Sequence, residues 1–222
     1  MPDPAISIMI VDDHHIVRYG LKQSLSSQEN FRIVAEAGTG KEAIELMAVH
    51  SPDVILMDVS MPDLNGIEAT RIILKSHPQT RIIALSMHAE KQYVLSMLKS
   101  GAKGYLLKNN LFEELVTAIH TVMEGNVFLS AQITEFIVQT AITPGSDDEA
   151  ESQAIASLTS REREILQLVA EGKNNAEISK LLYISKKTVD NHKRHIMGKL
   201  DLHTIPALTK FAIKHGISSL DV

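Results

Sequence analysis

The chain has 222 residues, 44% of them hydrophobic and 22% charged, with a formal net charge of −5. This composition is that of an ordinary globular protein, and the length suits one large domain or two small ones. Because the chain has no cysteine, disulfides, thiol catalysis, zinc fingers and iron–sulfur clusters are excluded. The longest apolar run near the start, Ile8–Val11, is too short for a signal peptide or a membrane span, so we expect a cytoplasmic protein.

Charge is distributed unevenly along the chain. Residues 1–143 carry 11 basic and 16 acidic side chains, residues 144–157 carry four acidic side chains and no basic one, and residues 158–222 carry 11 basic and 7 acidic ones. The segment TPGSDDEAES at 143–152 combines turn formers with acids and has no apolar period, which is typical of a flexible linker. We therefore predict a domain boundary there, followed by a basic domain that could bind nucleic acid.

Short apolar runs alternate with stretches of helical spacing in the first domain. Each run has four to six residues, the length of a strand buried on both faces: Ile6–Val11, Arg32–Ala37, Val54–Met57, Arg81–Leu85 and Gly104–Leu107. Apolar residues recur at helical spacing after each run, beginning with Ile16, Leu21 and Leu25. Thr39 with Glu42 three residues later predicts a capping box at the second helix. Five strand–helix units predict an α/β fold with a parallel sheet covered by helices on both sides.

Polar residues stand at the ends of four of the predicted strands. They are Asp12, Asp13, Asp58, Ser86 and Lys108. Because the carboxyl ends of parallel strands meet at one edge, where ligands bind, we expect these side chains to converge. Three carboxylates in one place repel one another, and Mg²⁺, which prefers oxygen ligands, would relieve this repulsion. Lys108 and Ser86 then complete a site for a phosphoryl group, with Asp58 as the nucleophile that forms an acyl phosphate.

These residues stand in motifs that resemble the receiver domain of two-component response regulators over residues 4–125. The motifs are VDDH at 11–14, MDVSMPDLNG at 57–66, ALSMH at 84–88 and GAKGYLLK at 101–108. The resemblance implies a flavodoxin-like, doubly wound sheet of five strands in the order 2-1-3-4-5. It also implies that Asp58 accepts a phosphoryl group from a histidine kinase. Asp13, Asp58 and the carbonyl of Ser60 would hold Mg²⁺, with Asp12 acting through water.

Further roles follow from the same resemblance. Lys108 would bind the phosphoryl group, Ser86 would move toward it, and Tyr105 would be the aromatic switch that follows. Ser60 and His88 occupy positions that tune the lifetime of the acyl phosphate in the family. Asn109 follows Lys108 where many receivers have proline, so the cis peptide usual at that bond is not expected.

The pattern after residue 157 is helical throughout. Thr159 with Glu162 predicts a capping box for a helix that ends near Gly172, and Asn174 with Glu177 begins a second short helix over Ala176–Leu182. After a tight turn, Ser185 caps a third helix, and Thr204 begins a fourth that ends near Gly216. Two short helices joined by a tight turn indicate a helix-turn-helix.

The third helix of this domain separates by face. Its apolar side carries Val189, Ile196 and Leu200, together with His192, and its polar side carries Lys187, Asp190, Asn191 and Arg194. Residues 186–200 hold five basic side chains and one acidic one. Asparagine can read adenine, arginine can read guanine and lysine contacts phosphate, so this face suits DNA.

Residues 158–216 resemble the LuxR-type helix-turn-helix. The motifs are LTSREREIL at 158–166, AEGKNNAEIS at 170–179 and ISKKTVDNH at 184–192. By position, the resemblance places Asp190, Asn191 and Arg194 toward bases and places four further residues toward phosphates: Lys186, Lys187, Thr188 and Lys193.

Two residues depart from the LuxR-type pattern. Tyr183 stands where the family usually has glycine, and a left-handed backbone there would cost about 1–2 kcal/mol. Pro206 lies in the first turn of the last helix, the family's usual dimer contact, where proline is tolerated.

The order receiver, linker, helix-turn-helix is that of the NarL/FixJ subfamily. We expect a receiver at 1–127, a linker helix and acidic linker at 128–157, and a DNA-binding domain at 158–222. The expected function is a transcription factor switched by phosphorylation of Asp58. Its partners would be a sensor histidine kinase, double-stranded DNA and a second copy of the chain, and its cofactor Mg²⁺. We expect no enzymatic activity beyond slow autodephosphorylation.

Two alternatives belong to other classes of protein. A phosphatase with an aspartate nucleophile needs a second carboxylate two residues after it, but Ser60 stands there after Asp58. A DNA-binding protein whose receiver is never phosphorylated would have no need of the intact acidic set. We therefore favour neither alternative.

Overall fold

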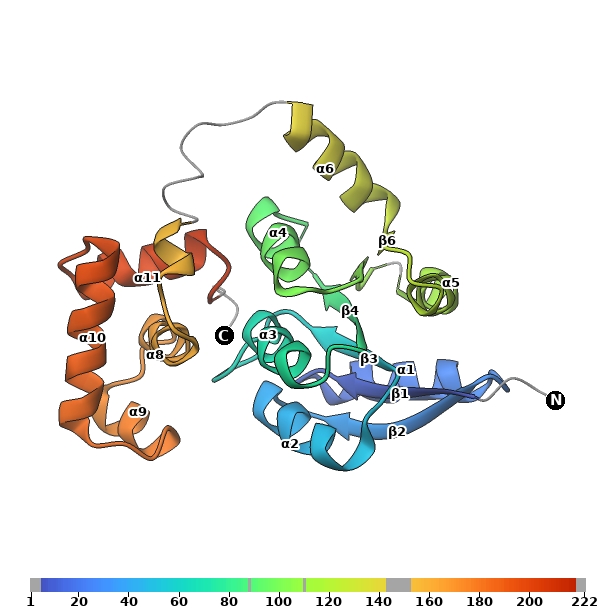
Figure 1. Cartoon of the computed structure of the whole chain (residues 1–222), viewed down its shortest axis with the longest axis horizontal. Helices are drawn as coiled ribbons and strands as arrows, with labels where there is room; N and C mark the ends of the chain where they lie inside the picture. The colour runs from blue at the N-terminus through green and yellow to red at the C-terminus, as the bar shows by residue number, and fades with distance from the viewer. Residues whose placement is uncertain (1–4, 88, 110, 143–152, 219–222) are drawn as a thin grey trace. The chain divides into compact units, whose positions relative to one another are not determined.

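The computed structural model describes residues 5–87, 89–109, 111–142 and 153–218. The chain divides into two compact units, Met1–Gln139 and Thr140–Val222 (Figure 1). Among the described residues, no helix is both long and apolar enough to cross a membrane.

The first unit alternates strands and helices. Its strands are β1 (Ile6–Val11), β2 (Phe31–Ala37), β3 (Val54–Asp58), β4 (Arg81–Ser86), β5 (Gly104–Leu107) and β6 (Phe128–Leu129). Its helices are α1 (His15–Ser26), α2 (Gly40–His50), α3 (Gly66–Ser76), α4 (Lys91–Ser100), α5 (Leu111–Met123) and α6 (Ala131–Ile142).

All strand pairs in the sheet are parallel, and the order is β2-β1-β3-β4-β5-β6. The predicted order of the first five strands is therefore confirmed. From β1 the chain adds β2 on one side and then β3 on the other, so the order of the strands reverses between β1 and β3. A crevice at such a reversal, outside the carboxyl ends of the strands, is the usual ligand site of open α/β sheets.

Helices cover both faces of the sheet, as predicted. Alternate residues of β1 point to opposite faces: Ile8 packs with α1 and α5, whereas Met9 packs with α2, α3 and α4. Figure 1 shows the two groups of helices on opposite sides of the strands. Every residue of β3 is buried, because a strand in the middle of a doubly covered sheet has no face toward water.

The segment that follows α5 packs with the first unit. Phe128 and Leu129 pair with Gly104 and Tyr105 of β5 and add a sixth strand that the sequence did not predict. Ile133 of α6 is fully buried in the core cluster on the α2–α4 side of the sheet. The predicted linker helix therefore begins only at Ala131, and its first turns pack in the core of the first unit.

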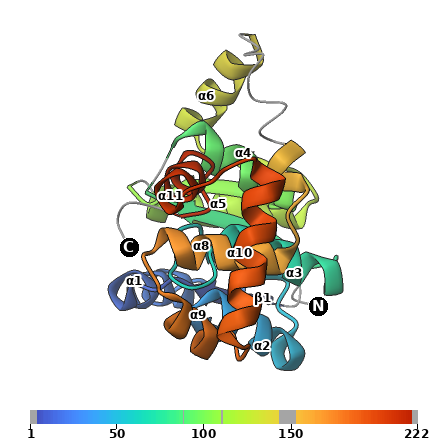
Figure 2. The same ribbon diagram turned by 90° about the vertical axis from the view of Figure 1, so that its left-hand side faces the viewer.

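The second unit is helical. Its helices are α8 (Ser160–Ala170), α9 (Asn175–Leu181), α10 (Lys186–Leu200) and α11 (Ile205–Lys214). A short helical turn at 153–156 precedes them. One apolar cluster joins all four helices and includes Leu166, Val189, Ile196 and Leu208. Figure 2 shows α10 running past α8, with α9 near one end of α10.

Side-chain caps begin the helices of the second unit where the sequence predicted them. Thr159 and Asn174 form capping boxes with Glu162 and Glu177, and the Ser185 hydroxyl accepts from the Thr188 amide. Each cap satisfies amide donors that the first turn of a helix leaves without partners. These three caps mark where α8, α9 and α10 begin.

Candidate functional site

Two buried carboxylates and one buried ammonium group meet at the carboxyl edge of the sheet. Asp12 follows β1 and is fully buried, Asp58 ends β3 and is 2% exposed, and Lys108 follows β5. The Lys108 Nζ lies 2.7 Å from Asp12 Oδ2 and 2.9 Å from Asp58 Oδ2. Charges this deeply buried are stable only when they are paired. The sheet topology thus brings together residues that are 46 or more positions apart in the chain.

Asp13 and His14 extend this cluster toward solvent. His14 precedes α1, and its Nδ1 lies 2.8 Å from Asp13 Oδ1 and 3.3 Å from Asp12 Oδ1. One ligand atom each from Asp12, Asp13, His14 and Asp58 lies within 4.8 Å of the others, so the group could hold a metal ion. The sequence analysis assigned no separate role to His14, whose ring the structure places beside the carboxylates.

Burial and the neighbouring charges change the acidity of the paired groups. Burial raises the pKa of Asp58 to about 7, and the Asp12 carboxylate adds to the rise, whereas Lys108 opposes it. Burial alone would lower the pKa of Lys108, but the carboxylates of Asp58 and Asp12 outweigh this effect and raise it. The cluster holds three carboxylates, those of Asp12, Asp13 and Asp58, and one ammonium group. A cation with oxygen ligands would relieve the excess negative charge.

The loop between β3 and α3 closes tightly over Asp58. The Ser60 amide donates to Asp58 Oδ1 at 3.3 Å, and the Gly66 amide donates to the Val59 carbonyl at 3.0 Å. A Cβ atom on Gly66 would lie 1.9 Å from the carbonyl oxygen of Asp58. Only glycine allows this approach, so Gly66 helps to fix the position of the Asp58 backbone.

Ser86 and Tyr105 lie beside each other on the neighbouring strands β4 and β5. Ser86 ends β4 and is 1% exposed, and Tyr105 in β5 is fully buried. Burial raises the pKa of Tyr105 well above its usual range, and a hydrogen bond with the Ser86 side chain opposes this rise. The two residues that the sequence interpretation linked in a switch are thus in contact.

Two expectations concern the ends of β4 and β5. His88, to which the resemblance assigned a tuning role, lies outside the described residues. No cis peptide bond is present among the described residues, and these include Lys108 and Asn109.

A second candidate surface lies on α10. All four residues of its predicted polar face are exposed: Lys187, Asp190, Asn191 and Arg194. Of the residues predicted to contact phosphates, Lys186 is exposed, and Thr188 and Lys193 are partly exposed. The opposite face is buried through Val189, Ile196 and Leu200. The predicted separation of faces is therefore confirmed, and a basic helix face lies open at the surface of this unit.

Hydrogen bonds organise this polar face. The Arg194 Nη2 donates to Asn191 Oδ1 at 3.1 Å, one turn apart on α10. The side chain of Asn175, the first residue of α9, contacts Asp190 and Lys193 of α10. The sequence interpretation did not include Asn175, because nothing in the local pattern predicts a contact between side chains 15 residues apart.

The two ends of α10 carry an ion pair and a left-handed turn residue. Near its carboxyl end, the Lys199 Nζ lies 2.7 Å from Glu162 Oε2 on α8. Before its amino end, Tyr183 has a φ of 53° and its side chain is 95% exposed. The turn therefore adopts the left-handed conformation in spite of the tyrosine that replaces the usual glycine.

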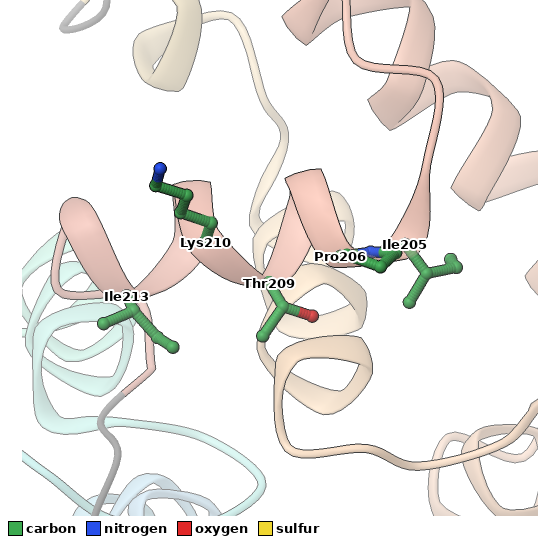
Figure 3. Close-up of a pocket in the computed structure, with 5 residues that line it drawn as sticks. All are labelled: Ile205, Pro206, Thr209, Lys210 and Ile213. Atoms are coloured by element: carbon green, nitrogen blue, oxygen red, sulfur yellow. The ribbon is translucent and has the colours of Figure 1, made fainter.

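The exposed side of α11 forms a shallow apolar groove. Figure 3 shows the residues that line it: Ile205, Pro206, Thr209, Lys210 and Ile213. The Thr204 hydroxyl caps α11 by accepting from the Ala207 amide, and Pro206 lies in the first turn. Since no intrahelical bond needs the amide of a first-turn residue, Pro206 is accommodated, as the sequence indicated.

Comparison with known families agrees with the geometry of both surfaces. The response regulator receiver domain family matches residues 8–120, half of the chain. The chain belongs to the response regulators. The family of bacterial regulatory proteins of the luxR type matches residues 156–212. This response regulator therefore combines a receiver domain with a LuxR-type DNA-binding domain.

Similar proteins cover nearly the whole response regulator. The oxygen regulatory protein NreC of Staphylococcus epidermidis is 41% identical over 94% of this chain and 97% of its own length. The transcriptional regulatory protein DegU of Brevibacillus brevis is 37% identical over 95% of this chain and 94% of its own length. Relatives of this identity and coverage share the arrangement of both domains with this chain.

Solved structures of RcsB resemble the response regulator in fold. A structure of the Salmonella typhimurium RcsB response regulator has 27% identity and a TM-score of 0.59, and the match covers 94% of this chain and 98% of that chain. The structure of an RcsB–DNA complex has 26% identity and a TM-score of 0.58, with 95% and 98% of the two chains covered.

Proposed function

We propose that Asp58 is the phosphoacceptor and that a sensor histidine kinase supplies its phosphoryl group. The observation that carries this proposal is the bridge from the Lys108 ammonium to both Asp12 and Asp58, at 2.7 and 2.9 Å. A fixed cation beside a buried carboxylate is suited to hold the anionic group that the carboxylate receives. Membership of the response regulator family supports the same reaction.

The acidic cluster suits Mg²⁺. Asp13, Asp58 and the carbonyl of Ser60 would hold the ion, with Asp12 bound through water. The fit rests on the excess of acidic over basic groups and on one ligand atom each of Asp12, Asp13 and Asp58, which lie within 4.8 Å of one another. When bound, Mg²⁺ supplies positive charge that neutralises the phosphoryl oxygens.

Transfer begins with a carboxylate oxygen of Asp58 and a phosphoryl group on a kinase histidine. The oxygen attacks phosphorus, the phosphorus–nitrogen bond breaks and an acyl phosphate forms. Lys108 then binds a phosphoryl oxygen, and the Ser86 hydroxyl donates to another. As Ser86 moves toward the phosphoryl group, its hydrogen bond with Tyr105 would break, and Tyr105 would then repack as the aromatic switch. Attack by water on the acyl phosphate gives slow autodephosphorylation.

The output of the switch is DNA binding through α10. Asp190, Asn191 and Arg194 would face bases in the major groove, whereas Lys186, Lys187, Thr188 and Lys193 would contact phosphates. This assignment rests on the exposure of these side chains around one basic face and on the LuxR-type family match. We place the regulator in the cytoplasm, where its DNA lies.

A homodimer would allow the phosphorylated regulator to bind two half-sites. The apolar groove on α11 supports a contact between copies on the DNA-binding unit. In this proposal residues 1–127 form the receiver, residues 128–157 the linker segment, and residues 158–222 the DNA-binding domain. β6 and Ile133 pack with the receiver core, and the acidic segment at 143–152 that the sequence indicated as a flexible linker lies outside the described residues.

The proposal is tested by coupling phosphorylation to DNA binding. The full chain, treated with acetyl phosphate and Mg²⁺ or left untreated, is used to select duplexes from a random pool and is then titrated with the selected sequence. We expect treatment to increase affinity at least tenfold for wild type and to have no effect on Asp58→Ala. Equal affinities with and without the acyl phosphate would contradict the proposal and favour a receiver that acts without phosphorylation.

A further inference from the structure

The polar face of α10 carries a carboxylate where DNA would lie. Asp190 is the one acidic residue among residues 186–200, and its side chain is exposed. A carboxylate that faces a polyanion opposes binding at every sequence, because it repels the phosphates. We therefore expect Asp190 to make a favourable interaction, in the complex or in the folded domain, that offsets this repulsion.

Asn175 holds the Asp190 carboxylate in place. The Asn175 Nδ2 donates to Asp190 Oδ1, and the Asn175 Oδ1 accepts from the Lys193 Nζ at 3.1 Å. The amide thus lies between a negative and a positive charge, which fixes the assignment of its nitrogen and oxygen. Since this bond uses only one oxygen of Asp190, the second oxygen keeps its capacity to accept a further hydrogen bond.

The chemistry of an ionised carboxylate limits which base it can recognise. A carboxylate only accepts hydrogen bonds. In the major groove, guanine and thymine present acceptors at their edges, whereas cytosine and adenine present an amino group. In adenine the acceptor N7 lies beside the amino group and would repel the carboxylate. Cytosine presents its amino donor without an adjacent acceptor, so it is the best partner.

We propose that Asp190 selects cytosine at one position of each half-site and that Asn175 is the residue that positions Asp190. This inference rests on the proposed function, in which α10 enters the major groove. Asn175 couples α9 to base recognition, because its amide fixes where the carboxylate lies on the face of α10. Asn191 and Arg194, which are paired with each other at 3.1 Å, then read neighbouring bases.

A purely structural role for Asp190 gives a different expectation. If Asp190 only fastens α10 to α9, its replacement would lower stability, and the loss of one negative charge would strengthen binding to all sequences alike. Base preference would then stay unchanged. Base preference is therefore the measurement that separates the two roles.

The test selects duplexes from a random pool with the full-length, phosphorylated chain. The variants are Asp190→Asn, Asn175→Ala and, as a matched control, Asp201→Asn. Asp201 ends α10 with a φ of 51° and is exposed, so asparagine fits its left-handed backbone. The control also removes one negative charge, but at the carboxyl end of α10.

We expect wild type and Asp201→Asn to enrich the same motif, with cytosine at the position that Asp190 contacts. Asp190→Asn should reduce the preference for cytosine there at least about tenfold and favour adenine, to which an amide can both donate and accept. Asn175→Ala should weaken the preference for cytosine by a smaller factor and leave the other positions unchanged.

Two other outcomes would overturn the inference, and they can be told apart. If wild type selects a motif that Asp190→Asn leaves unchanged, Asp190 does not read a base, and the proposed function still stands. If wild type enriches no sequence at all, sequence-specific DNA binding fails, and the role of Asp190 fails with it.

Discussion

Gly66 shows how one residue controls the backbone geometry around Asp58. Its missing side chain lets the backbone at the start of α3 pass so close to Asp58 that a Cβ atom would lie 1.9 Å from the Asp58 carbonyl oxygen. Backbone cannot yield to such a contact as a flexible side chain can. Any other residue must therefore move the loop that carries Asp58 and Ser60.

The first prediction concerns Gly66→Ala. We expect a loss of stability of about 2 kcal/mol or more, measured by urea unfolding, because the added methyl group clashes with fixed backbone. We also expect phosphorylation by acetyl phosphate to slow at least tenfold, measured by intact mass.

Gly198→Ala is the matched control, because no atom lies within 4 Å of a Cβ atom at that exposed helical position. It should raise stability by about 0.5–1 kcal/mol. Wild-type stability and phosphorylation in Gly66→Ala would show that the loop tolerates the methyl group.

The second prediction concerns Tyr183, which has a φ of 53° and a side chain that is 95% exposed. Tyr183→Gly should raise the free energy of unfolding by about 1 kcal/mol, since relief of the left-handed strain exceeds the entropy that glycine loses on folding. Thermal or urea unfolding measures the effect. A destabilised Tyr183→Gly would mean that the exposed ring makes a contact that offsets its backbone strain.

At the scale of elements, the contact between α8 and α10 joins a helix cap to an ion pair. Glu162 closes the capping box of α8 with Thr159 and also pairs with Lys199, which lies near the end of α10. Although partial burial opposes it, hydrogen bonds from Lys199 and Thr159 hold the pKa of Glu162 below its usual value of 4.5. One carboxylate thereby anchors the start of α8 against the carboxyl end of α10.

The third prediction follows from this lowered pKa. Glu162→Gln should reduce stability at pH 7 by about 1–2 kcal/mol, because glutamine keeps the cap but loses the ion pair. A group with a lowered pKa stabilises the fold above its ordinary pKa of 4.5, and this contribution is lost as pH falls. The difference between wild type and variant in urea unfolding should therefore shrink as the pH falls below 4.5.

Glu177→Gln serves as the control for the ion pair. It occupies the same capping position in α9, but the structure records no lysine paired with it among the described residues. The difference in stability between wild type and Glu177→Gln should change little between pH 7 and acid pH. A loss in Glu162→Gln that is constant over this range would contradict a role for the charge.

Local signals predicted most elements, and three details differ from the expectation. Thr39 accepts from the Glu42 amide as predicted, but the Glu42 carboxylate accepts from the Gly38 amide instead of completing the box. Ile16 is 85% exposed, because the stripe of α1 that packs on the sheet runs through Val17, Leu21 and Leu25 and leaves Ile16 beside it. The two residues of β6 are too few to show a period, and only their pairing with β5 makes them a strand.

At the scale of the whole molecule, chain topology explains why the receiver site was predictable. A parallel sheet collects strand ends at one edge, so Asp12, Asp58 and Lys108 could be brought together from the sequence pattern alone. Contacts that depend on side-chain direction could not be predicted in this way. The ring of His14 beside Asp13 and the amide of Asn175 beside Asp190 are of this kind.

Phosphoryl transfer to Asp58 is the step that would link the receiver to the DNA-binding domain, and intact mass tests it most directly. Wild type, Asp58→Ala and Asp63→Asn are incubated with acetyl phosphate, with and without Mg²⁺. Asp63 is the matched control, since it carries a carboxylate in the same loop, and asparagine suits its φ of 65°.

We predict a single phosphoryl adduct on wild type and on Asp63→Asn, formed only when Mg²⁺ is present, and none on Asp58→Ala. An adduct on Asp58→Ala at the wild-type level would show that another residue is the acceptor. An adduct on wild type that forms equally well without Mg²⁺ would contradict the metal-dependent site at the end of β3.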